Sequence, residues 1–178
     1  MSMIEDMYES TKILENINNF DKDGFANQLK FWLKELHFFY NNLVPNQTNN
    51  PSTSYYQIKP SMRPKESQIA FFNLRRGYPK EVYDGHYCYI LKDFGTKYLV
   101  VPTTSVKDGT KPNPKFEYDI EIKNFKNKML TRMQISDIRS LDIQRFNEKK
   151  QVYDVVTDRN DIVHEIQRIL SFDIDTIK

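Results

Sequence analysis

Apolar residues recur at helical spacing along residues 4–43. The first block runs through Ile4, Met7, Thr11, Leu14 and Ile17, and a stronger stripe continues through Phe25, Leu29, Trp32, Leu36, Phe39 and Leu43. Steps of three and four residues place side chains on one face of an α-helix. Residues 21–24 separate the two blocks, so the pattern predicts an N-terminal antiparallel helical hairpin over residues 1–45. An aromatic stripe of this kind is more often core or a helix-packing seam than a ligand pocket, and His37 beside it is expected to be structural.

The hairpin is followed by a segment of different composition. Residues 46–67 are rich in Asn, Gln, Ser and Thr, and the region contains Pro45, Pro51, Pro60 and Pro64. Proline removes a backbone donor and interrupts a helix. Residues 46–67 are therefore predicted to be a polar linker, and residues 68–178 a second domain.

Beyond the linker the apolar period changes to that of a β-strand. Asp84-Gly85 is a favoured type I′ turn because both residues tolerate positive φ, and it predicts a tight hairpin between strands at 78–83 and 86–91. The clearest alternation lies at 116–123, where Phe116, Tyr118, Ile120 and Ile122 are interleaved with charged residues. Further strands are predicted at 69–74, 97–101 and 129–134.

A basic, exposed loop is expected at 105–115, and the chain is expected to end in a helix that begins at Asp161 and is capped by Asp158. Ile162, Ile166, Ile169 and Leu170 form the apolar face of this helix. The predicted fold class is α+β, with a mostly antiparallel sheet, a C-terminal helix and the N-terminal helical hairpin.

Composition excludes several classes of protein. The 178 residues carry a formal net charge of only +2, so nucleic-acid binding would need a local basic cluster. Cys88 is the single cysteine and the three histidines are scattered, which argues against a disulfide or a zinc site, and no glycine-rich phosphate loop is found. No metal and no cofactor are expected. An acidic start without a secretory pattern, and the lack of a long apolar run, predict a cytoplasmic protein with no membrane segment.

Three motifs carry a family resemblance. They are Arg75-Arg76-Gly77, then residues 85–91 (GHYCYIL) followed by residues 100–105 (VVPTTS), and finally residues 137–146 (DIRSLDIQRF). In this order they resemble the opening strands, and the strand and turn before the last helix, of the MazF/PemK toxins. The resemblance covers none of the N-terminal hairpin.

The resemblance implies a small SH3-like, PemK-like β-barrel that forms a homodimer and cleaves single-stranded RNA, including mRNA, without a metal. A cognate antitoxin protein would block the activity, and DNA binding is expected only in a complex with that antitoxin. Thr104 matches the catalytic hydroxyl of the family. His86 stands about where the family has a catalytic arginine, although the family's long loop before that arginine is replaced here by the predicted tight turn.

Cleavage of RNA without a metal uses the ribose 2′-hydroxyl as nucleophile, and it requires a base, an acid and donors for the phosphate. His86 suits proton transfer because histidine side chains titrate near neutral pH. The other candidates are Thr104 and Ser105 as hydrogen-bond donors, Arg75, Arg76 and Lys107 as phosphate-binding cations, and Tyr87, with Tyr83 and Tyr89, as stacking surfaces. Each also has a purely structural interpretation: a surface histidine, a strand-end threonine, a solvated basic rim and barrel-wall tyrosines.

Other functions stay open at this point. The same fold could serve as a catalytically inactive RNA-binding or protein-interaction module. The N-terminal hairpin could cover the barrel as an antitoxin does, or mediate dimerisation. His86 and Cys88 share a strand face, which would suit a Cys/His nucleophilic pair, but no further residue supports a cysteine hydrolase.

Overall fold

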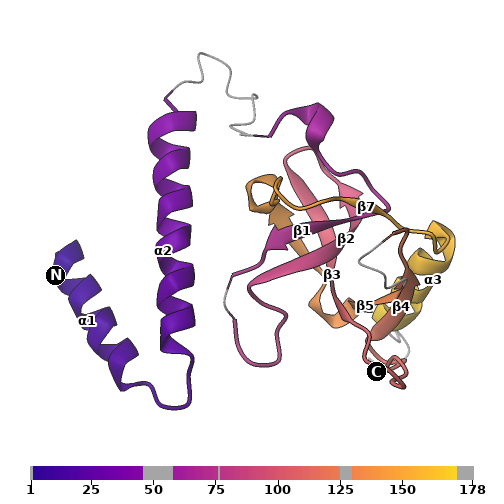
Figure 1. The fold of residues 1–178 in the computed structure, drawn as a ribbon, viewed down its shortest axis with the longest axis horizontal. Coiled ribbons are helices and arrows are strands. Elements are labelled where there is room, and N and C mark those ends of the chain that lie inside the picture. Colours follow the sequence, from indigo (N-terminus) through magenta and orange to yellow (C-terminus); the bar gives the residue numbers. More distant parts are fainter. Residues whose placement is uncertain (1, 46–57, 76, 125–129, 172–178) are drawn as a thin grey trace, which may run out of the picture. The chain divides into compact units, whose positions relative to one another are not determined.

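The computed structural model describes residues 2–45, 58–75, 77–124 and 130–171. The chain divides into two compact units, Met1–Tyr55 and Tyr56–Lys178, which we describe separately (Figure 1). No helix in these described ranges is both long enough and apolar enough to cross a membrane.

The first unit consists of the two predicted helices. α1 spans Met3–Asn16 and begins at a capping box, in which Ser2 and Glu5 satisfy each other's backbone N–H groups. α2 spans Lys22–Phe38, is capped by Asp21 and continues into a π-helical turn, η1, at Phe39–Leu43. None of the described residues of α1, α2 or η1 is buried. The two helical blocks are confirmed, but they have no core of their own.

The second unit is built around an antiparallel sheet. Its strands are β1 (Gln68–Asn73), β2 (Gly85–Asp93), β3 (Lys97–Ser105), β4 (Glu117–Glu121), β5 (Leu130–Gln134), β6 (Arg139–Asp142) and β7 (Tyr153–Asp154). They pair in the order β4-β5-β3-β2-β1-β7, and β6 adds to β3. Short 3-10 turns lie at Pro60–Met62, Ile135–Asp137 and Ile143–Arg145, and α3 (Arg159–Leu170) follows the sheet. The α+β class and the C-terminal helix capped by Asp158 are confirmed.

The two ends of the sheet approach each other. Beyond β4 and β7, Ile122 and Val155 form an isolated antiparallel bridge. The Lys123 N–H donates to the Asp154 carbonyl at 3.0 Å, and the Val156 N–H donates to the Glu121 carbonyl at 2.8 Å. The sheet is thus strongly curled, without a continuous ladder between its two ends.

Two buried clusters lie on opposite faces of the central strands. Alternating residues of β2 and β3 divide between them, because successive side chains of a strand point to opposite faces. One cluster contains Phe72, Cys88, Ile90, Tyr98, Val100 and Leu141 among others. The other contains Tyr89, Val101, Ile120 and Met133 together with Ile162 and Ile166 of α3. The predicted apolar face of α3 is therefore what covers the second face of the sheet.

The predicted tight hairpin at Asp84-Gly85 is wrong. β1 pairs directly with β2 so that Asn73 lies opposite Gly85, and residues 74–84 form a long loop instead of a strand at 78–83. The base of this loop is closed by Leu74 N–H to Asp84 O at 2.7 Å and Asp84 N–H to Arg75 O at 2.9 Å. The strand that precedes this loop and pairs with β2 is β1, in which Ile69 and Phe72 are buried.

The end of the predicted linker packs on the sheet. Ile58 joins the first buried cluster, and the Tyr98 hydroxyl donates to the Pro64 carbonyl at 2.9 Å. Glu66 accepts the Asp93 N–H at 3.0 Å and binds the Arg159 guanidinium at 3.0 Å. Residues 58–67 thus belong to the second unit, while residues 46–57 lie outside the described residues.

Candidate functional site

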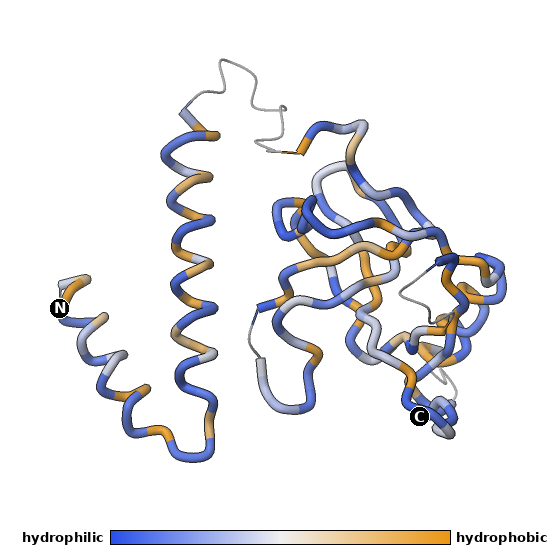
Figure 2. Tube along the Cα trace, in the orientation of Figure 1, coloured by the Kyte–Doolittle hydropathy of each residue, from blue (hydrophilic) through white to orange (hydrophobic). Residues whose placement is uncertain are grey.

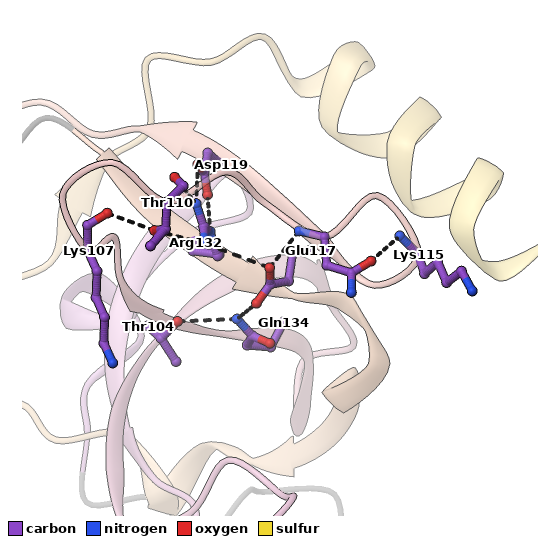
Figure 3. Close-up of polar contacts among 9 residues, drawn as sticks. Thr104, Lys107, Thr110, Lys115, Glu117, Asp119, Arg132 and Gln134 are labelled. Carbon is purple, nitrogen blue, oxygen red and sulfur yellow. Dashed lines mark hydrogen bonds and ion pairs between the residues drawn. The ribbon is translucent and has the colours of Figure 1, made fainter.

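One face of β3, β5 and β4 is polar (Figure 3). The register places Thr104 opposite Arg132, Arg132 opposite Asp119, and Gln134 opposite Glu117. Residues that lie opposite each other in antiparallel strands point to the same face of the sheet. The five side chains of Thr104, Glu117, Asp119, Arg132 and Gln134 therefore form one surface, which we call the polar face.

Arg132 is the best-bonded member of the polar face. Its guanidinium donates to both carboxylate oxygens of Asp119, at 2.6 and 2.9 Å, and lies 3.8 Å from Glu117. It also donates to the carbonyl of Thr110 at 3.0 Å and to the Thr110 hydroxyl at 3.3 Å. The hydrogen bond with Asp119 raises the pKa of Arg132 above its ordinary value. Arg132 is thus committed to holding the 105–116 loop against β4 and has little capacity for a phosphate.

A chain of hydrogen bonds ends at Thr104. The Gln134 amide donates to Glu117 at 3.1 Å and to the Thr104 hydroxyl oxygen at 3.2 Å (Figure 3). A hydroxyl that accepts a hydrogen bond keeps its own hydrogen for donation, and the accepted bond polarises the O–H group. Thr104, which is half-buried at the end of β3, is therefore oriented as a hydrogen-bond donor.

His86 lies at the start of β2 next to the same end of β3. The pairing of β2 with β3 ends at Cys88 opposite Pro102, and His86 and Thr104 each lie two residues beyond that pair. The imidazole is half-buried, and its Nδ1 is 3.2 Å from the Thr103 carbonyl oxygen. A carbonyl can only accept, so this contact is a hydrogen bond when Nδ1 carries the hydrogen. In neutral His86 the lone pair then resides on Nε2, which is the nitrogen left to accept a proton.

The cationic candidates are spread along two loops. Arg75 is half-buried at the base of the 74–84 loop with φ of 76°, and Arg76 lies outside the described residues. Ser105 and Lys107 are exposed where β3 runs into the 105–116 loop. The Lys107 carbonyl accepts both the N–H and the hydroxyl of Thr110, so the Lys107 backbone is tied to the residue that Arg132 holds.

Tyr87 does not lie with His86. Successive residues of β2 face opposite ways, and the Tyr87 ring packs edge-on against Phe71 and Tyr153, with ring centroids 5.2 and 5.7 Å away. Burial and the neighbouring Tyr153 raise the pKa of Tyr87 to about 12. Tyr89 is completely buried and offers no face for stacking. The structure therefore gives Tyr87 and Tyr89 packing roles and separates them from the polar face.

The Cys/His pair that a shared strand face would permit is not formed. The Cys88 side chain is buried, and its thiol contacts the His86 carbonyl at 3.7 Å, not the imidazole. Burial raises the pKa of the Cys88 thiol far above its ordinary value, although Arg139 opposes the shift. A nucleophilic cysteine needs an accessible thiolate, which this environment disfavours. Within the described residues, no group of three or more acidic, histidine or cysteine side chains could hold a metal ion.

Sequence reasoning missed Glu117, Arg132 and Gln134. The sequence does contain a pattern that could have indicated them. Glu117 and Asp119 occupy alternate positions of one strand, and Arg132 and Gln134, whose side chains can donate to carboxylates, occupy alternate positions of another. The two strands pair only through a non-local register, which the alternation alone does not fix. A second missed element is Asp137, which binds Arg139 at 2.8 Å and accepts the Val82 N–H of the 74–84 loop at 3.0 Å.

No model of a known protein family matches the chain, and no curated protein is detectably similar to it.

Proposed function

We propose that the second unit is a toxin-like, metal-independent endoribonuclease that cleaves single-stranded RNA. The observation that carries the proposal is the juxtaposition of His86 and Thr104. Each lies two residues beyond the paired Cys88 and Pro102 on the neighbouring strands β2 and β3, and the His86 imidazole is hydrogen-bonded to the carbonyl of the residue just before Thr104. A proton acceptor and a hydrogen-bond donor on adjacent strands supply two of the groups that this reaction requires, the base and a donor for the phosphate.

In the proposed reaction, Nε2 of His86 removes the proton from a ribose 2′-hydroxyl. The 2′-oxygen then attacks the adjacent phosphorus, and the bond from phosphorus to the 5′-oxygen breaks. The departing 5′-oxygen takes up a proton from water and the His86 imidazolium returns its proton to solvent, so the products are a 2′,3′-cyclic phosphate and a 5′-hydroxyl end. The bond from Nδ1 to the Thr103 carbonyl fixes the ring orientation and stabilises the imidazolium that forms.

The negative charge that develops on the phosphate needs donors. Thr104 supplies an O–H group that is polarised through Gln134. Ser105, the next residue of β3, points to the opposite face of the sheet and has no role in the proposed reaction. Lys107 is exposed at the start of the adjoining loop and supplies the positive charge, with Arg75 at the base of the 74–84 loop as a further candidate. Arg76 lies outside the described residues and is a candidate from the sequence alone. Arg132 contributes by holding the 105–116 loop, since its own hydrogen bonds go to Asp119 and Thr110.

We further propose that the curled sheet corresponds to the small barrel of the MazF/PemK family. The bridge between Ile122 and Val155, which brings the two ends of the sheet together, supports this proposal. So does the 74–84 loop before His86, because a long loop between the first two strands is what the family resemblance implies. The proposal includes a cytoplasmic protein that is controlled by an antitoxin.

An inactive RNA-binding or protein-interaction module is the alternative. It is favoured by the replacement of the family arginine by His86, and by the fact that Arg132, the cation of the polar face, is already neutralised by Asp119. Such a module would bind RNA or a protein without cutting RNA.

The test uses purified full-length chain and several long single-stranded RNAs in EDTA. Cleavage is expected, with His86→Ala and Thr104→Val each reducing the rate by about 10²-fold or more, because positioned proton transfer and transition-state donors contribute on that scale. Thr104→Ser keeps the hydroxyl and should retain most of the activity. His164→Ala is the matched control, since His164 is exposed on α3.

Absence of cleavage under all conditions, or cleavage that the His86 and Thr104 variants leave unchanged, would refute the nuclease assignment. RNA binding without cleavage would select the inactive module.

A further inference from the structure

The helical hairpin exposes an unusual amount of apolar surface. Large apolar side chains of α1, α2 and the segments beside them are between 37% and 77% exposed: Met3, Ile4, Met7, Tyr8, Ile13, Ile17, Phe20, Phe31, Trp32, Leu33, Phe38 and Tyr40. Short helices gain most of their stability from packing an apolar face. Large exposed apolar patches on soluble proteins mark interaction surfaces. The first unit therefore presents an apolar surface of the kind that packs against a partner.

A groove shows where that partner would bind. α1 and α2 diverge from their connecting turn, and apolar positions recur along both (Figure 2). Between them lies a hollow of about 710 Å³. Its apolar lining consists of Leu14, Ala26, Leu29 and Leu33, and its polar lining consists of Thr11, Lys30, Lys34 and His37. The groove would thus accept a helix with an apolar face and a net negative charge.

We propose that this groove binds α1 of a second copy of the chain, so that two hairpins interlock as a four-helix bundle. α1 has the required chemistry. Its exposed apolar face includes Ile4 and Met7, which line no part of the groove of their own copy. Its charged residues are Glu5, Asp6, Glu9 and Glu15 against the single Lys12, whereas Lys30 and Lys34 lie in the groove. The acidic side chains of α1 and the lysines of the groove would attract each other once they lie within a Debye length.

Two-fold symmetry makes the arrangement reciprocal. If α1 of one copy lies in the groove of the other, the same contact forms a second time, as in an isologous dimer. The spacing of the α2 stripe, Phe25, Leu29, Trp32, Leu36, Phe39 and Leu43, alternates four and three residues, which is the repeat of helices that pack side by side. Leu29 is the one residue that this stripe shares with the groove, so in the proposed bundle most of the stripe would pack against a helix other than the bound α1.

The exposed area is sufficient for a stable dimer. Large apolar and aromatic side chains present roughly 200 Å² each, and here about half of that is exposed. Burying about eight of the twelve would remove roughly 800 Å² per copy, which is the size of a standard specific interface. This proposal is independent of any nuclease activity.

The first test is the mass of the full-length chain by sedimentation velocity across micromolar concentrations. The wild type is expected to dimerise. Leu29→Glu/Leu33→Glu should raise the dissociation constant at least tenfold, because it places carboxylates in an apolar contact. Asn27→Glu is the matched control: Asn27 is exposed on α2, does not line the groove, and should leave the dimer unchanged. A monomeric wild type, or a dimer that survives the groove variant, would overturn the proposal.

A charge exchange identifies the occupant and does not rely on a variant that could lose its fold. Lys30→Glu/Lys34→Glu and Asp6→Lys/Glu9→Lys should each weaken their own homodimer at low salt. Mixed together they should form a heterodimer, because each acidic α1 then meets a basic groove and each reversed α1 meets a reversed groove. If mixing restores no dimer, α1 of a second copy is not the occupant, and the groove serves another protein or the chain's own second unit.

Discussion

Arg132 is a nearly buried cation whose removal should be costly. Its side chain is 9% exposed and is held by four hydrogen bonds to Asp119 and Thr110, with Glu117 close by. Arg132→Met preserves volume on the polar face but leaves the carboxylates of Asp119 and Glu117 side by side without a cation. Breaking a buried ion pair costs about 3–5 kcal/mol. The two carboxylates are 20% and 17% exposed and regain some hydration, so we expect the lower end, about 3 kcal/mol.

The assay is urea unfolding of the full-length chain followed by the near-ultraviolet circular dichroism of its tyrosines. Most of the eleven tyrosines lie in the second unit, whereas the single tryptophan, Trp32, lies in the first. For a unit of this size, about 3 kcal/mol corresponds to a lowering of Tm by roughly 10 °C. Lys97→Met is the matched control, because it removes the same charge from an exposed position of β3 and should change stability by less than about 0.5 kcal/mol.

A double-mutant cycle separates the ion pair from other effects. Asp119→Asn alone removes the charge that Arg132 binds, and the double variant should cost less than the sum of the singles by at least about 1 kcal/mol. The loss of Thr110 as an anchored residue should also speed tryptic cutting at Lys107 and Lys115. An effect of Arg132→Met below about 1 kcal/mol, or additive single effects, would refute the view that this network holds the 105–116 loop in place.

Two predictions concern pH. The hydrogen bond from the Asp93 N–H, and then Lys92, lower the pKa of Glu66 below its ordinary 4.5. This carboxylate therefore adds stability above pH 4.5, and the contribution is lost as the pH falls through the lowered pKa. Glu66→Gln should cost less than about 1 kcal/mol at pH 7 and nothing in strong acid, as measured by urea unfolding at each pH. The pKa of Tyr87 is raised to about 12, so the stability that its protonated hydroxyl contributes is complete below pH 10 and declines as the pH rises toward 12. Tyr87→Phe should lessen this alkaline loss of stability. An unchanged alkaline unfolding transition would contradict the raised pKa of Tyr87.

The periodic elements could be predicted from sequence because each has a local signature. Two helical stripes, the alternation at 116–123 and the apolar face of the last helix all appear in the structure within a few residues of the predicted limits. Such patterns report which face is buried, and burial is what stabilises these elements. What they do not report is which strand pairs with which.

The Asp84-Gly85 turn shows how a local signal is overridden. Asp84 does adopt a positive φ of 60°, as the turn propensity predicts. Gly85 is required for another reason: a Cβ at this position would lie 2.5 Å from the Phe71 ring across β1. Pairing β1 with β2 buries Ile69, Ala70 and Phe72, and this burial outweighs the preference of two residues for a tight hairpin. Glu117 and Gln134 escaped sequence analysis for the same reason, since they meet Thr104 only through the register of three strands.

Under the proposed function, a histidine in place of the family arginine redistributes the chemistry of the site. An arginine stays protonated and supplies charge, whereas neutral His86 can accept a proton at Nε2 because Nδ1 is bonded to the Thr103 carbonyl. The charge that arginine would have supplied to the phosphate must then come from another group. Arg132 is bound to Asp119, so the exposed Lys107 is the described cation on the loop after β3 that best meets this need. The network that fixes Thr110, and through it the backbone of Lys107, is on this view as much a part of the site as His86 and Thr104.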